Sequence, residues 1–168
     1  MPISFPGRKT MVSADTPDWS REQRSGWDPG RALLASIRAY QRTPTSRARR
    51  SLAVIRHRFW SAVSGADIPL TTQIGGGLLL PHPNGIVIHP DAVIGPNCLI
   101  FQQVTLGTNG KGVPRIDGHV DIGAGAKLLG PIHVAAHAKI GANAVVTCDV
   151  PAGATAVGIP ARIILSSD

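Results

Sequence analysis

The sequence has little of what marks a secreted or membrane protein. Its two cysteines, Cys98 and Cys148, are too few for the disulfide framework of a small secreted domain. No apolar run approaches the roughly 18 residues of a membrane helix, and the N-terminus lacks the apolar core of a signal peptide. We therefore expect a soluble, cytoplasmic protein. A chain of 168 residues is long enough for one domain with a core and a smaller appendage.

Acidic residues are scarce in the N-terminal third. Residues 1–60 hold twelve Arg or Lys against four Asp or Glu, whereas the remainder holds five against six. The formal charge of +7 therefore belongs to the N-terminal region and does not indicate a nucleic-acid-binding domain over the whole chain.

The N-terminal region divides in two. Residues 1–28 are rich in Pro, Ser and charge without a period, which predicts a disordered or loosely docked segment. Residues 29–65 predict two helices with arginines on a solvated basic face; Ser46 is expected to cap the second helix and Gly65 to end it. The apolar positions at helical spacing are Leu33, Leu34, Ile37 and Tyr40 in the first helix and Leu52, Ile55, Phe59 and Val63 in the second.

From Ile68 onward the aliphatic residues recur every six positions. A hexapeptide period predicts a parallel β-helix in which each unit is a short strand plus a corner and three units make one coil. The fold class is therefore mainly β, with about five coils over residues 66–168 and a short helical region before them. The inward-pointing positions are Ile68, Ile74, Leu80, Ile86, Ile88, Ile94, Ile100, Leu106, Ile116, Ile122, Leu128, Val134, Ile140 and Val146.

Two breaks interrupt this period. The step from Ile86 to Ile88 is two residues long and follows His82 closely, so we expect the coil to bulge near "PHPNG" and to carry His82 at an irregular corner. The step from Leu106 to Ile116 is ten residues long, which predicts an extruded loop over 107–115. This loop is glycine-rich, but no GK[ST] leads into a helix, so it is not expected to be a phosphate loop.

The solenoid segment resembles a known family. The stretches "ADIPLTTQIGGG", "HPNGIVI", "AVIGPNCLIFQQVTLG", "IGAGAKLLGPI", "AKIGANAVVTCDVP" and "GIPARII" are similar to those of the hexapeptide acyltransferases with a left-handed β-helix, and within them to the serine O-acetyltransferases. The resemblance implies a left-handed coil, acetyl-CoA as co-substrate, a role in cysteine biosynthesis, and a homotrimer with active sites between neighbouring subunits.

The resemblance also implies site residues. It assigns His82 as the general base for the acceptor hydroxyl, which suits imidazole because its pKa lies near working pH. Asp67 matches an acidic position of the active-site coil. The backbone amides of Gly107 and Ala124 are implied to face the pantetheine or thioester, and Lys139 to lie near the CoA phosphates. No metal is expected.

Three departures from the family pattern bear on the acceptor. Pro81 stands where the family has an aspartate beside the base, so a carbonyl or Asp67 would have to orient the imidazole. Gly112 and Val113 stand where the family places Arg and His to hold the amino acid. The C-terminal "LSSD" lacks the long tail that docks into cysteine synthase, so this partner is not expected.

Alternatives remain open on these residues. The acceptor is L-serine or, as the runner-up, a sugar or another small alcohol. A non-catalytic scaffold with a basic arm is the second alternative, although the retained histidine motif argues against decay of the site. The stretch 47–58 is expected to be a solvated face, or else to steer anionic CoA or an acidic partner. The remaining solenoid histidines fall at outward corners, where solvated polar residues are expected: His89, His119, His133 and His137.

Overall fold

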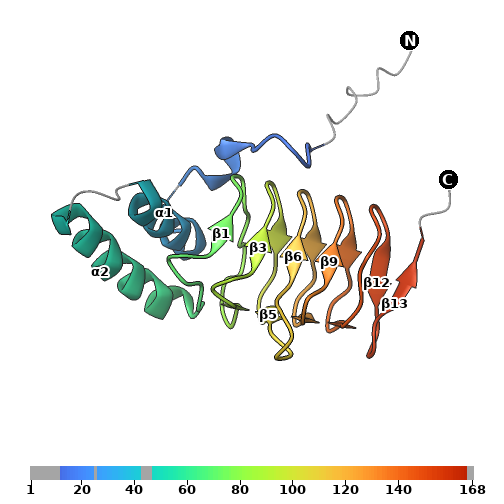
Figure 1. Cartoon of the computed structure of the whole chain (residues 1–168). Helices are drawn as coiled ribbons and strands as arrows, with labels where there is room; N and C mark the ends of the chain where they lie inside the picture. The colour runs from blue at the N-terminus through green and yellow to red at the C-terminus, as the bar shows by residue number, and fades with distance from the viewer. Residues whose placement is uncertain (1–11, 25, 43–46, 166–168) are drawn as a thin grey trace, which may run out of the picture.

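The computed structural model describes residues 12–24, 26–42 and 47–165. Two helices precede a β-solenoid of five turns, and the turns stack along one axis with α1 and α2 at its N-terminal end (Figure 1). The predicted solenoid class with its short helical region is confirmed, while the left hand of the coil stays a prediction. No described helix is both long and apolar enough to cross a membrane.

Each turn of the solenoid contributes one short strand to each of three sheets. The β1–β9 sheet contains β1 (Gln73–Ile74), β3 (Val93–Ile94), β6 (Arg115–Ile116) and β9 (His133–Val134). The β4–β13 sheet contains β4 (Leu99–Ile100), β7 (Asp121–Ile122), β10 (Lys139–Ile140), β12 (Thr155–Val157) and β13 (Arg162–Ile164). The β2–β11 sheet contains β2 (Val87–Ile88), β5 (Thr105–Gly107), β8 (Lys127–Leu129) and β11 (Val145–Val146). All pairings are parallel except that of β12 with β13.

The core of the solenoid is the stack of aliphatic residues that the hexapeptide period predicts. All fourteen predicted positions are buried, with exposed fractions of 8% or less. In-register pairing places equivalent residues directly above one another, as for Ile94, Ile116 and Val134. Each turn therefore buries one aliphatic side chain per sheet, and the hydrophobic contribution is repeated along the axis.

The first break lies slightly earlier than the sequence count places it. The Ile86 carbonyl accepts from Asp67, and the Val104 carbonyl accepts from Val87, so Ile86 occupies the position that Val104 holds in the next turn. Ile86 and Ile88 are thus both regular buried residues. The two additional residues fall within 81–85, where Pro81 and His82 are exposed. The second break forms the extruded loop, which spans 108–114 between β5 and β6 and lies within the predicted range (Figure 1).

Helix α1 (Pro29–Arg42) covers the open end of the solenoid. Its Leu33, Leu34 and Ile37 are buried and belong to the same core as the first turns. A side chain on Gly30 would meet the Leu80 carbonyl oxygen at 2.6 Å, so glycine permits this close approach. The helix therefore shields the aliphatic stack from solvent at its N-terminal end.

Helix α2 (Arg47–Ser64) packs against α1. Its apolar stripe is exposed: Leu52 by 57%, Ile55 by 64%, Phe59 by 55% and Val63 by 40%. The residues that α2 buries are Ala53 and Ser64, and Trp60 packs against the core from a partly buried position. Gly65, at φ +66°, ends the helix as expected, and Ser46 lies outside the described residues.

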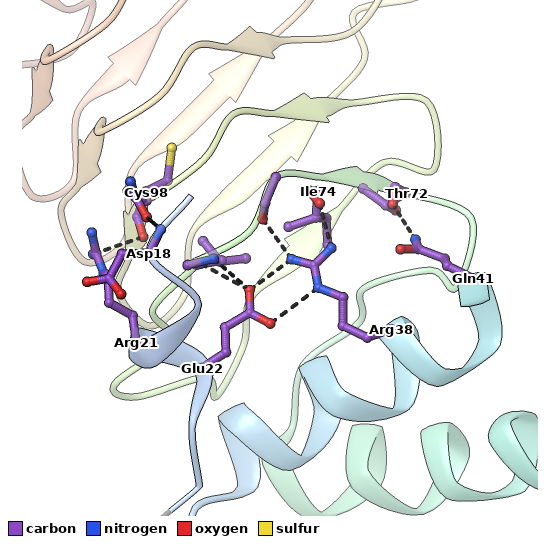
Figure 2. Close-up of polar contacts among 12 residues, drawn as sticks. Asp18, Arg21, Glu22, Arg38, Gln41, Thr72, Ile74 and Cys98 are labelled. Atoms are coloured by element: carbon purple, nitrogen blue, oxygen red, sulfur yellow. Dashed lines mark hydrogen bonds and ion pairs between the residues drawn. The ribbon is translucent and has the colours of Figure 1, made fainter. Parts of the chain in front are cut away.

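The segment before α1 makes specific contacts with the first turns (Figure 2). The short helix η1 (Trp19–Glu22) presents Glu22 to Arg38 of α1 at 2.9 Å. Arg38 also donates to the carbonyls of Ile74 at 2.5 Å and Gly75 at 2.7 Å, and Glu22 accepts from the Gly77 amide at 2.9 Å. Residues 1–28 were expected to be disordered or loosely docked; residues 1–11 and 25 lie outside the described residues.

Candidate active site

His82 lies at the corner between the β4–β13 and β2–β11 sheets. The turn that follows it is held by a hydrogen bond from the Gly85 amide to the Gly65 carbonyl at 2.7 Å and by one from the Ile86 amide to the Pro83 carbonyl at 3.2 Å. The His82 side chain is exposed. In the described part of the chain its ring makes no hydrogen bond, so neither the Asp67 carboxylate nor a carbonyl orients it here.

Asp67 begins the β2–β11 sheet in the first turn. Its amide donates to the Ile86 carbonyl at 2.8 Å, and its own carbonyl accepts from the Ile88 amide at 2.9 Å. These two bonds fix the backbone, while the side chain points outward and is exposed. The Asp67 carboxylate is therefore available to a ligand. Asp67 pairs with Val87 of β2, the strand that follows the His82 corner.

Ala124 lies at the same corner of the prism as His82, further along the axis. Its carbonyl accepts from the Asn143 amide at 2.8 Å, but its own N–H has no hydrogen-bond partner within the described ranges. An unpaired N–H at a rigid corner is a suitable donor to a carbonyl or oxyanion.

Gly107 and Lys139 lie on other parts of the surface. Gly107 is the last residue of β5 and is paired with Leu129. Ala124 comes before β8, so the two residues lie toward opposite ends of neighbouring strands in the β2–β11 sheet. Lys139 is on β10 of the adjacent sheet, beside Asp121 and with its side chain exposed. Within one copy, His82 and Ala124 therefore lie at the same corner, and Asp67 pairs with the strand that follows this corner. Gly107 and Lys139 lie elsewhere on the surface of the same copy.

Helix α2 contributes side chains that sequence reasoning missed. A depression of about 420 Å³ lies between α2 and the first turn, and both Arg58 and Asp67 line it. The arginine-rich stretch was interpreted as a solvated face. The signal that was available is the proximity of this stretch to Asp67, together with the spacing of His57 and Ser61 by one helical turn.

The remaining titratable groups behave as structural residues. Burial raises the pKa of the Cys98 thiol to about 11, and the thiol donates to the Asp117 carbonyl at 3.2 Å, so it stays protonated. His119 and His137 are paired through their Nδ1 atoms at 2.7 Å. Within the described residues, no three His, Cys, Asp or Glu side chains gather as a metal site.

The chain is similar in sequence and in fold to serine acetyltransferases. No protein-family model matches the chain. The chain is 44% identical over 127 residues to the serine acetyltransferase of Escherichia coli K12, an alignment that covers 73% of this chain and 46% of that protein. It thus spans about half the length of the curated relatives it matches.

Solved structures agree with this similarity. A serine acetyltransferase in complex with CoA superposes with a TM-score of 0.72 at 40% identity, covering 82% of this chain and 58% of the other. A soybean serine acetyltransferase complexed with serine gives a TM-score of 0.68 at 39% identity, covering 81% of this chain and 56% of the other.

Proposed function

The described chain is homologous to the serine acetyltransferases, a hexapeptide-repeat acyltransferase family, and on this premise we propose that it transfers the acetyl group of acetyl-CoA to the hydroxyl of L-serine. The single observation that carries the proposal is the exposed His82 at an irregular corner of an otherwise regular solenoid. The two additional residues at this corner lie in the segment that resembles the family's catalytic segment. An exposed histidine at such a corner is better explained by a functional role than by packing.

In this mechanism, the neutral His82 imidazole takes the proton of the acceptor hydroxyl while the hydroxyl oxygen attacks the thioester carbonyl. The C–S bond of the resulting tetrahedral intermediate breaks, the departing thiolate takes the proton back from the His82 imidazolium, and the products are O-acetylserine and CoA with His82 neutral again. The unpaired Ala124 N–H supports this role because it supplies a donor for the developing oxyanion. Asp67 assists at the acceptor, and Gly107 and Lys139 contact CoA.

We extend the proposal to the assembly and its setting. Gly107 and Lys139 lie away from His82 within one copy, which supports the homotrimer with sites between subunits that the resemblance implies. The exposed apolar stripe on α2 supports association of copies. The free thiols of Cys98 and Cys148 suit a reducing cytoplasm, where the product would serve cysteine biosynthesis.

The experiment is a CoA-release assay with acetyl-CoA and a set of acceptors: L-serine, L-homoserine and several sugars. We expect L-serine to be acetylated with a high KM, because Gly112 and Val113 replace the cationic residues of the family's loop. Pro81→Asp combined with Val113→His is expected to raise kcat/KM for serine. Faster turnover of a sugar than of serine would favour the alternative acceptor class, and no CoA release with any acceptor would contradict the proposal.

A further inference from the structure

The depression between α2 and the first turn has a composition suited to a small charged ligand. Its walls include His57, Arg58 and Ser61 of α2 and Gly65, Ala66 and Asp67 of the first turn. It therefore places one guanidinium and one carboxylate around a space of about 420 Å³. An amino acid carries the two complementary charges.

Helix α2 is held in a fixed register over this depression. The Ser61 hydroxyl donates to the Ala66 carbonyl at 2.5 Å, and His57 Nε2 lies 2.8 Å from the Ile68 carbonyl oxygen. These two carbonyls belong to the residues on either side of Asp67. Because Arg58 lies on the same helical turn as His57 and Ser61, its position relative to Asp67 is set by both anchors.

Both charged groups are available. Arg58 and Asp67 are exposed, and neither side chain makes a hydrogen bond or ion pair within the part of the chain that the structure describes. The depression is therefore lined by one arginine and one aspartate whose charged groups have no partner in the described part of the chain. A guanidinium binds a carboxylate through two parallel hydrogen bonds, which gives orientation as well as affinity.

We propose that this depression is the acceptor's carboxylate subsite and that Arg58 is the residue that holds the carboxylate. The inference rests on the proposed function and names a cation outside the 107–115 loop, in which Gly112 and Val113 offer no charge. One arginine in place of the two loop residues of the family leaves the expected KM for serine high. With the carboxylate on Arg58, the ammonium and hydroxyl part of the amino acid lies toward Asp67.

The test is calorimetric titration of L-serine and L-serinamide into the full chain and into Arg58→Gln. L-serine is expected to bind the unaltered chain, and Arg58→Gln to weaken this binding by roughly 10- to 100-fold, the loss expected for a hydrogen bond to a charged group. L-serinamide lacks the carboxylate, so its affinity is expected to be low and equal in both. Arg58→Lys is expected to recover part of the affinity, because it keeps the charge without the planar fork.

The matched control is Arg56→Gln, which removes an exposed arginine of the same helix that does not line the depression. It is expected to bind L-serine as the unaltered chain does. Absence of L-serine binding, equal binding of L-serine and L-serinamide, or equal losses in Arg56→Gln and Arg58→Gln would each overturn the subsite. Serine binding that depends on Arg58 without any CoA release would instead contradict the proposed acetyl transfer and leave the subsite supported.

Discussion

The solenoid and helix α2 both carry a regular apolar period, yet only the solenoid buries the residues that its period marks. In the solenoid, Ile122 and its equivalents are fully enclosed. In α2, residues such as Ile55 and Phe59 are more than half exposed. The difference shows that a period predicts the shape of an element reliably, whereas the burial of its apolar face depends on what surrounds it.

The reason lies in the range of the contacts. A solenoid turn packs against the preceding turn, which has the same sequence pattern, so the inside of the coil is determined by the repeat itself. Helix α2 has no copy of its own sequence pattern stacked on it. It packs against α1, buries Ala53 and Ser64, and contacts Tyr40 through Arg50. Its apolar stripe then faces outward, where only a second molecule or a further segment would cover it.

The most severe test of this comparison replaces one isoleucine in each region. Ile122→Ala removes a fully buried side chain and is expected to lower the free energy of unfolding by about 2–5 kcal/mol. Ile55→Ala removes a side chain that is 64% exposed and is expected to change it by less than about 0.5 kcal/mol in the monomer. Urea unfolding at several protein concentrations measures both. A large, concentration-dependent loss for Ile55→Ala would mean that another copy covers the stripe.

A smaller effect is expected at the junction of the two regions. Glu22→Gln removes the carboxylate that pairs with Arg38, at a site where both side chains are about nine-tenths buried. We expect a loss of about 1–3 kcal/mol, because the guanidinium stays largely buried without its counter-charge. Asp28→Asn is the control: it breaks the more exposed pair with Arg31 but keeps a side chain able to cap α1, and should cost at most about 1 kcal/mol. Equal losses in the two variants would contradict the buried role of Glu22.

The smallest expected effect concerns pH and the corner residue His119. Burial lowers the pKa of His119 below its ordinary value near 6.5, with further lowering by His137, Arg21 and Lys139 against an opposing contribution from Asp121. Protonation of His119 therefore favours the unfolded chain, so the contribution of this residue to stability is complete above pH 6.5 and is lost as the pH falls through the lowered pKa. His119→Asn, which also accepts φ +53°, should flatten this slope in thermal unfolding. An unchanged slope would assign the pH dependence to other groups.

Most of the solenoid could be predicted from the sequence because its contacts repeat. The break in the period marks the corner that carries His82, whereas the assignment of His82 as the base comes from the resemblance and stays a prediction. The depression between α2 and the first turn could not be predicted. His57, Arg58 and Ser61 line it because α2 packs beside the first turn, where Ser61 and His57 contact the carbonyls of Ala66 and Ile68. No local pattern in the sequence marks such contacts.

The central claim is that the interrupted corner carries the base, and the kinetics of His82→Ala test it most directly. The account predicts a fall in kcat of roughly 10²- to 10⁴-fold for acetyl transfer to serine, with the affinity for acetyl-CoA nearly unchanged. His133→Ala, which removes an exposed histidine from the regular β1–β9 sheet, should keep full activity. Equal activity of His82→Ala and the unaltered chain would contradict the assignment of His82 as the general base.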